Sequence, residues 1–142
     1  MSVVDAAQRE AALDPSRSFL VRAPAGSGKT ELLIQRYLAL LARASRPEAV
    51  VAITFTRKAA AEMRRRVVDA LARARGPRPE KAHEAATWDL ARAAMARDER
   101  LGWRLEENPR RLAIRTFDSR CTSIVRRAPW LSRLGPPPAR CC

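Results

Sequence analysis

Residues 19–30 read FLVRAPAGSGKT, a short apolar run that passes through a glycine-rich turn and ends in Lys29 and Thr30. Gly26 and Gly28 would let the backbone turn sharply with its N–H groups facing inward, as a bound phosphate requires. Lys29 would then reach the β- and γ-phosphates of a nucleotide, and the hydroxyl of Thr30 would ligate Mg²⁺. The spacing therefore predicts a phosphate-binding loop with Lys29 and Thr30 as its catalytic residues.

The strict form of this pattern has glycine where the chain has Ala23. An ordinary Gly-Ser loop between a strand and a helix is the alternative interpretation. A strand is expected at 18–23 and an amphipathic helix at 29–44. Such a helix would direct its positive end at the bound anion, which favours the phosphate-binding interpretation. Its apolar side would consist of Leu32, Leu33, Tyr37, Leu40 and Leu41.

Length and charge limit the possible classes of protein. The chain has 142 residues, 46% of them hydrophobic, which suits one domain with a core large enough to fold. A net charge of +13, nearly all from arginine, favours a polyanionic partner such as nucleic acid. GC-rich coding would also enrich arginine, alanine and proline, so charge alone leaves this open. Membrane-spanning runs and a signal peptide are not evident, and the expected compartment is the cytoplasm.

The chain has few residues that could bind a metal ion or act as a catalytic histidine. The chain has three cysteines, Cys121, Cys141 and Cys142, whose spacing suits neither a disulfide framework nor a zinc site. His83 is the single histidine, and it is expected on a solvated helix face. These counts argue against a zinc cluster and against a catalytic triad built on histidine.

Three strand-then-helix units are expected, which predicts an α/β fold with a parallel sheet and flanking helices. Besides the strand at 18–23, the sequence AVVAIT at 49–54 predicts a strand buried on both faces. The third strand is expected at 111–117. Helices are expected at 3–13, 29–44, 59–74, 80–96 and 118–127.

The long helix at 59–74 would bury Ala59, Met63, Val67 and Leu71 along one side. The sequence GPRP at 76–79 then breaks the pattern and predicts a sub-domain boundary. The expected divisions are an ATP-binding α/β segment at 1–75, a helical insertion at 76–109, a return to the α/β core at 110–128 and an irregular tail at 129–142.

Two more loops follow expected strands, and in a parallel sheet such loops share the edge at which ligands bind. Their hydroxyls, aromatic rings and cations suit a phosphodiester backbone and a stacked base. The alternative for each loop is a helix start capped by Thr, Ser or Asp beside a buried Phe, and the residue types leave both interpretations open. The first loop comprises Thr54, Phe55, Thr56, Arg57 and Lys58, and the second comprises Thr116, Phe117, Asp118 and Ser119.

Four elements together resemble a known family. Gln8, APAGSGKT at 23–30, ITFTRKAAAEM at 53–63 and RTFDS at 115–119 occur in the order and spacing of the amino-terminal motifs of UvrD/Rep/RecB-type superfamily 1 DNA helicases. The resemblance extends from about Asp5 to Leu134, and ITFTRKAAAEM is its most specific part. The TFDS form and its surroundings look most like the AddA/RecB-type helicase–nuclease subunits.

The resemblance implies a RecA-like P-loop NTPase fold, incomplete in this chain, with a small helical insertion. It implies an enzyme of DNA repair that couples ATP hydrolysis to movement along single-stranded DNA, typically 3′ to 5′, with no membrane contact and with a possible helicase–nuclease partner subunit. By resemblance, Gln8 would read adenine and favour ATP over GTP. ATP and Mg²⁺ would be held by Ala23, Pro24, Ala25, Gly26, Ser27, Gly28, Lys29 and Thr30, with the metal on Thr30. Single-stranded DNA would be contacted by Thr54, Phe55, Thr56, Arg57, Thr116, Phe117, Asp118 and Ser119.

Such enzymes also need a strand-borne Asp-Glu pair to hold Mg²⁺ and polarise the attacking water. Asp98-Glu99 and Glu106-Glu107 follow no clean apolar strand, and Asp118 is better explained as part of a DNA-contacting loop. In the family this acidic motif lies downstream of TFDS. We therefore expect a truncated or frameshifted gene product with little turnover and with exposed apolar sheet edges.

Two other functions stay open. One is a non-enzymatic, basic nucleic-acid-binding module with a vestigial phosphate loop, whose DNA binding would ignore ATP and Mg²⁺. The other is an unrelated P-loop enzyme such as a small-molecule kinase, for which ITFTRKAAAEM would have no explanation.

Overall fold

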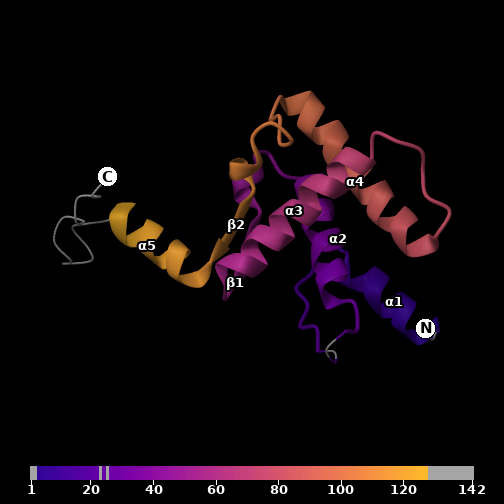
Figure 1. Ribbon diagram of the computed structural model, residues 1–142. Helices are drawn as coiled ribbons and strands as arrows, with labels where there is room; N and C mark the ends of the chain where they lie inside the picture. Colours follow the sequence, from indigo (N-terminus) through magenta and orange to yellow (C-terminus); the bar gives the residue numbers. More distant parts are fainter. Residues whose placement is uncertain (1–2, 23, 25, 128–142) are drawn as a thin grey trace.

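The computed structural model describes residues 3–22, 24 and 26–127, with side chains from residue 7 onward. Helices α2, α3 and α4 form the body of the molecule, and α1 and α5 extend from it at opposite ends (Figure 1). The helices are α1 (Val3–Ala12), α2 (Lys29–Leu41), α3 (Arg57–Arg73), α4 (Ala82–Leu101) and α5 (Phe117–Arg127). The strands are β1 (Val51–Thr54) and β2 (Ala113–Thr116), and two 3₁₀ turns are η1 (Pro47–Ala49) and η2 (Pro109–Arg111).

All five predicted helices are present. α4 continues past its expected end at 96 to Leu101, where Gly102 ends the helix with a φ of 64°. Glycine adopts this left-handed conformation without a Cβ penalty, which explains why the helix ends there. No helix in the described part of the chain combines the length and apolarity that crossing a lipid bilayer requires.

The two strands form a parallel sheet in which Val51 lies opposite Ala113 and Thr54 lies opposite Thr116. Parallel neighbours need a crossover, and α3 supplies it by packing on both strands. Because Thr54 and Thr116 are partners in the register, the two strands end at the same level. The loops that follow them therefore leave the sheet side by side, and the predicted parallel α/β class is confirmed.

The predicted strand at 18–23 is wrong for the residues that the structure describes. Residues 18–22 form no helix or strand and pair with neither β1 nor β2, and Ala23 lies outside the described residues. Leu20 is 82% exposed, so this apolar segment contributes little to the core. An extended segment becomes a strand only when a neighbour receives its backbone hydrogen bonds, and the described chain offers none beside it.

The expectation that the strand at 49–54 is buried on both faces is also wrong. Val51 and Ile53 are exposed on one face of β1, while α3 packs on the sheet. The described chain therefore leaves these two side chains largely uncovered. The strand was predicted from its apolar composition, but burial on both faces requires helices on both sides of the sheet.

The core lies between the sheet and the three central helices. Leu38 and Leu41 of α2 meet Val67 and Leu71 of α3, and Ile114 joins them from β2. The prediction was right for Met63, Val67 and Leu71, but Ala60 is buried in place of Ala59. On α2 the buried positions Ile34, Leu38 and Leu41 follow helical spacing, and the predicted Leu33 is exposed.

α4 belongs to the same core. Ala91, Ala94 and Met95 are buried against α2 and α3, and Trp103 is buried just after the helix. Gln35 donates to the hydroxyl of Thr87 at 2.9 Å, and that hydroxyl donates to Glu31 at 2.6 Å. These bonds fix α4 to the first turns of α2. The sub-domain boundary at 76–79 stays a prediction.

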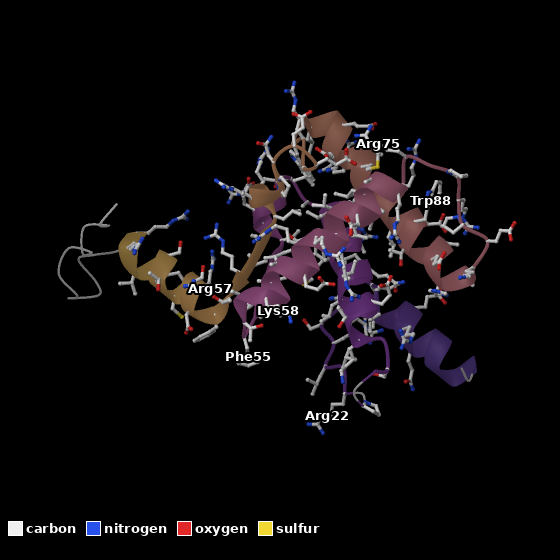
Figure 2. The ribbon with its side chains drawn as sticks, in the orientation of Figure 1. Arg22, Phe55, Arg57, Lys58, Arg75 and Trp88 are labelled. Carbon is white, nitrogen blue, oxygen red and sulfur yellow. The ribbon has the colours of Figure 1, made fainter. Side chains whose placement is uncertain are left out.

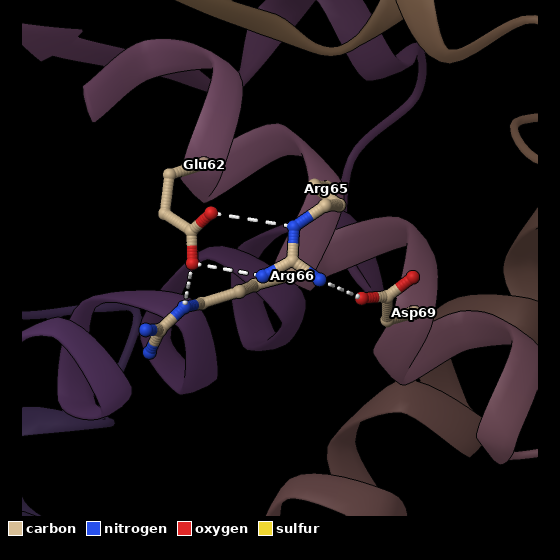
Figure 3. A network of polar contacts seen from close by, with 4 residues as sticks. All are labelled: Glu62, Arg65, Arg66 and Asp69. Atoms are coloured by element: carbon tan, nitrogen blue, oxygen red, sulfur yellow. Dashed lines mark hydrogen bonds and ion pairs between the residues drawn. The ribbon is translucent and has the colours of Figure 1, made fainter. Parts of the chain in front are cut away.

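The exposed face of α3 carries a charge cluster (Figure 3). Glu62 binds Arg65 at 2.9 Å and Arg66 at 2.7 Å, and Arg65 also binds Asp69 at 2.9 Å. Hydrogen bonds from Arg65 and Arg66 lower the pKa of Glu62 from its ordinary 4.5 to about 2. Since all four side chains are exposed, the contribution to stability is small.

Through Glu62, this cluster gives the free energy of unfolding a small dependence on acid pH. Because the pKa is lowered in the folded state, the stabilisation is present above pH 4.5 and is lost as the pH falls toward about 2. We expect Glu62→Gln to flatten that part of the acid dependence, measured by circular dichroism in urea at a series of pH values. Glu84→Gln, on an exposed carboxylate of α4, is the control. An unchanged acid dependence in Glu62→Gln would contradict the assignment.

Candidate functional site

The loop before α2 has the backbone that a tight turn requires. Gly26 and Gly28 both have a φ of 78°, a conformation that residues with a Cβ rarely adopt. Gly28 is also the N-cap of α2, so the loop ends where the helix begins. A Cβ on Gly28 would lie 3.2 Å from the guanidinium group of Arg9, while one on Gly26 would meet open space.

Lys29 lies across this loop. Its ammonium group donates to the carbonyl of Pro24 at 2.9 Å, and the backbone N–H of Ser27 donates to the same oxygen at 3.3 Å. The loop therefore closes on itself around the Pro24 carbonyl. A phosphate oxygen would offer Lys29 a charged acceptor in place of this neutral one, and charge-assisted hydrogen bonds are the stronger kind. Ala23 and Ala25 lie outside the described residues.

Helix α1 forms one wall of the loop's surroundings. Gln8 and Arg9 of α1 line a hollow of about 580 Å³ together with Pro24, Ser27 and Lys29. Arg9 also donates a hydrogen bond to the carbonyl of Ser27. Arg9 was not among the predicted site residues. It belongs to no motif, and its contact with Ser27 joins two segments that are separated in the sequence. Gln8 and the loop before α2, which are distant in sequence, thus border one hollow.

The residues at this hollow fit a triphosphate better than they fit a metal ion. The hydroxyl of Ser27 is buried and has no hydrogen-bond partner in the described chain, so it is available to an oxygen of a ligand. Thr30 is exposed and lies outside the lining. No Asp or Glu is among the described residues that line the hollow. Mg²⁺ would therefore find no carboxylate ligand among the described residues of this lining.

Arginine side chains hold the irregular segment that precedes the loop. Arg36 of α2 donates to the carbonyls of Ala12, Asp14 and Arg17, the last at 2.6 Å. The guanidinium carbons of Arg36 and Arg17 lie 5.3 Å and 5.5 Å from the centre of the Phe19 ring. These contacts position the segment without strand pairing, and they hold Phe19 in the wall of the hollow.

The loops after β1 and β2 each begin a capped helix. Thr56 accepts a hydrogen bond from the N–H of Ala59 at 3.1 Å, and Thr116 accepts one from the N–H of Ser119 at 3.2 Å. The capping part of the alternative interpretation is therefore confirmed. Its other part, a buried Phe, is wrong, because Phe55 is 96% exposed and Phe117 is 58% exposed.

These two loops share a second hollow of about 610 Å³ at the end of the sheet. The register of the strands explains the pairing, since Thr54 and Thr116 lie side by side where the strands end. α3 and α5 both begin at this hollow, so the positive ends of two helices lie near it. Phe55, Arg57 and Lys58 lie together at the start of α3 (Figure 2). The lining is basic, with Arg57, Arg115, Arg126 and Arg127 against the single acid Asp118.

The structure brings together some of the predicted site residues. Gln8, Pro24, Ser27 and Lys29 line the first hollow, and Phe55, Arg57, Thr116, Asp118 and Ser119 line the second. The remaining described candidates lie outside both linings, namely Gly26, Gly28, Thr30, Thr54, Thr56 and Phe117. Thr54 donates to the carbonyl of Thr56 at 3.1 Å, so it shapes its loop. The two hollows share no lining residue.

Parallel strands, the crossover helix α3 and loops gathered at the carboxyl ends of the strands define an open-sheet α/β protein, a class that binds ligands at that edge. The chain belongs to the UvrD/REP helicase N-terminal domain family, whose model matches residues 4–134. The UvrD/Rep-type resemblance stated from the motifs is therefore confirmed.

Several curated proteins are similar over part of the chain. DNA helicase II of Salmonella typhimurium is 51% identical over 61 residues, which are 42% of this chain and 8% of that protein. An ATP-dependent helicase/nuclease subunit of Clostridioides difficile is 39% identical over 69 residues, 46% of this chain and 5% of that protein. ATP-dependent DNA helicase UvrD1 of Mycobacterium bovis is 50% identical over 62 residues, 43% of this chain and 8% of that protein. No solved structure matches the chain significantly.

Proposed function

We propose that this chain binds ATP with Mg²⁺ and contacts single-stranded DNA, as the amino-terminal ATP-binding portion of an ATP-dependent DNA helicase. The observation that carries the proposal is the hollow that Gln8 and Lys29 border together, at the N-terminus of α2. It combines a hydrogen-bonding amide, an ammonium group and a helix N-terminus, which suit the base and the phosphates of one nucleotide. On this proposal the fold is a RecA-like P-loop fold.

In this site each residue has a separate task. Gln8 reads the adenine, and the loop at 23–30 holds the phosphates through its N–H groups and Lys29. Ser27 adds its buried hydroxyl as a further contact to a phosphate oxygen. Bound Mg²⁺ would neutralise charge on the phosphates, with the Thr30 hydroxyl as its ligand from this chain. Arg9 keeps the loop in place through the Ser27 carbonyl.

The described residues favour nucleotide binding over rapid hydrolysis. Hydrolysis needs a carboxylate that holds Mg²⁺ and orients the attacking water, and no described Asp or Glu lines this hollow. Asp118, the nearest substitute in the sequence, lines the other hollow. We therefore assign Asp118 to DNA contact and expect little ATP turnover from this chain.

The proposed DNA contact uses the second hollow. Phe55, which lines this hollow, and the exposed Phe117, which lies outside the lining, offer aromatic faces to bases. Thr116 and Ser119 of the lining supply hydroxyl groups, and Thr54 and Thr56 shape the loop after β1. Arg57 offers a guanidinium group that can bind a phosphate with two parallel hydrogen bonds. Asp118 is the one acid in the lining, and it would accept hydrogen bonds from base N–H groups.

Phe55→Ala tests this contact. Stacking of one base on an aromatic ring contributes about 1–3 kcal/mol, so affinity for oligothymidylate should fall by about 5- to 150-fold. The free energy of unfolding should stay within about 0.5 kcal/mol of that of the unaltered chain, because the ring is 96% exposed. Fluorescence anisotropy measures the affinity, and Leu101→Ala, an exposed apolar residue of α4, is the control. Equal affinity of Phe55→Ala and the unaltered chain would argue against the DNA assignment.

The basic hollow also favours the second candidate, a nucleic-acid-binding module whose phosphate loop is vestigial. Four arginines line that hollow, and none of them lines the nucleotide hollow. DNA affinity that does not respond to ATP and Mg²⁺, in a chain that also fails to bind ATP, would favour this candidate. A small-molecule kinase does not fit the family to which the chain belongs.

The matched segments cover less than a tenth of each relative described above. Unwinding, strand translocation and a role in DNA repair are therefore proposed for a longer protein of which these residues form the amino-terminal part. The similarity to the Clostridioides difficile helicase/nuclease protein suggests a helicase–nuclease partner subunit for it. We propose the cytoplasm as its compartment.

A further inference from the structure

A third hollow, of about 410 Å³, adjoins the proposed DNA site. It shares Arg57, Arg115, Thr116 and Ser119 with the hollow that holds Phe55, so the two are continuous. Arg64 of α3 and Arg110 of η2 extend the lining beyond the two motif loops. Neither Arg64 nor Arg110 belongs to the motifs that carried the sequence interpretation.

The charge of this third hollow is not neutralised within the described chain. Arg57, Arg64, Arg110 and Arg115 line it, and none of its described lining residues is an acid. No ion pair joins these four arginines to a described carboxylate. Other arginines of the molecule are paired, such as Arg75 with Glu106 at 2.9 Å, Arg78 with Asp89 at 2.7 Å and Arg111 with Glu48 at 2.7 Å.

Arg64 supplies a second observation. It donates a hydrogen bond to the backbone carbonyl of Ile114 in β2, which fixes its guanidinium group beside the sheet. Its Nε is buried and has no hydrogen-bond partner among the described residues. A buried guanidinium N–H normally has an acceptor, and an oxygen-bearing ligand in the hollow that Arg64 lines would supply one.

Phosphate matches this set of groups. Guanidinium groups bind phosphate oxygens through two parallel hydrogen bonds, and four of them surround one space here. A nucleic-acid backbone places phosphates at regular intervals, so a strand that stacks a base on Phe55 can bring a further phosphate into the adjoining space. The continuity of the two hollows favours a strand over a separate small anion.

We propose that Arg64, Arg110 and Arg115 form a second phosphate subsite for the same single strand of DNA whose base stacks on Phe55. The subsite rests on the proposed DNA-binding function and adds residues that its motifs do not include. Its role is to lengthen the contact along the strand. Short oligonucleotides that fill only the Phe55 hollow would reach Arg115, which lines both hollows, but not Arg64 or Arg110.

The test compares the full chain with the double variant Arg110→Gln and Arg115→Gln. Arg64 is left unchanged because it binds β2. Affinity for fluorescein-labelled oligothymidylates of about 4 and about 15 nucleotides is measured at several salt concentrations. We expect the double variant to bind the longer oligonucleotide about 10- to 30-fold more weakly near 0.1 M salt, with a salt slope about 1.4 smaller. Binding of the shorter one should weaken by only about 5-fold, the effect of one lost charge, because Arg115 lines the Phe55 hollow and Arg110 does not.

A charge-matched double variant, Arg43→Gln with Arg100→Gln, removes two exposed arginines that line neither hollow. An equal loss in this control, or no loss in the Arg110/Arg115 variant, would overturn the subsite. Inorganic tripolyphosphate serves as a competitor, and displacement of the longer oligonucleotide at equal phosphate concentration would identify a small-anion site instead.

Phe55→Ala separates the claim of a second phosphate subsite from the claim that the chain binds DNA. If it weakens binding while the Arg110/Arg115 variant does not, the subsite fails and the proposed function stands. If the full chain binds neither oligonucleotide, both fail.

Discussion

Replacing Lys29 with alanine should weaken ATP binding by about 10- to 100-fold while leaving the fold intact. A hydrogen bond to a charged group contributes about 1.5–3 kcal/mol, and each 1.4 kcal/mol is a factor of about ten in affinity. Lys29 lies at the N-terminus of α2 and borders the hollow beside Gln8. Its bond to the Pro24 carbonyl is a short-range contact within one loop, so its loss should disturb the core little.

The measurement is isothermal titration of ATP with Mg²⁺ into each protein. Lys81→Ala is the matched control, because this exposed lysine before α4 forms a surface ion pair with Glu84 at 3.6 Å and lies outside the lining of the nucleotide hollow. The control should bind ATP as the unaltered chain does. Equal affinities for all three proteins would refute the assignment of Lys29 to the phosphates.

Replacing Leu71 with alanine should cost about 2–5 kcal/mol of unfolding free energy, the usual range for removing a buried leucine. Leu71 is fully buried in the cluster that joins α2, α3, α4 and β2. The truncated side chain would leave a cavity among Val67, Leu38 and their neighbours. A loss of this size is a large fraction of the stability of a small domain, so the variant should unfold at a much lower urea concentration.

Urea unfolding followed by circular dichroism measures this loss. Leu33→Ala is the control, since the same change is made on α2 at a side chain that is 55% exposed. It should cost less than about 1 kcal/mol. Similar losses for the two variants would show that Leu71 is not in the core, and the packing of α3 against α2 and α4 would have to be rejected.

The helices and the order of the elements could be predicted from the sequence because those signals are local. The spacing of Met63, Val67 and Leu71 already defines one side of a helix, and Thr56 lies at its cap. The strand at 18–23 could not be judged in this way, because a strand needs a partner that can lie anywhere along the chain. The exposure of Val51 and Ile53 could not be predicted for the same reason, since it depends on which helices of the rest of the chain cover the sheet.

In the candidate sites, too, some features could be predicted from the sequence and others could not. The turn at Gly26 and Gly28 was predictable from residue types, since positive φ values select glycine. The contact between Arg9 and the Ser27 carbonyl was not, because it joins two elements that no periodic pattern links. The exposure of Phe55 likewise required the structure, since the same residue at a capped helix start could have been buried.

The central claim is that the loop before α2 binds the phosphates of a nucleotide. The most direct measurement is the affinity of the unaltered chain for ATP, ADP and AMP, each with Mg²⁺, by isothermal titration. We predict one binding site whose affinity falls from ATP to ADP to AMP, because each lost phosphate removes contacts to Lys29 and the loop N–H groups. Equal affinity for all three, or no binding of ATP, would contradict it.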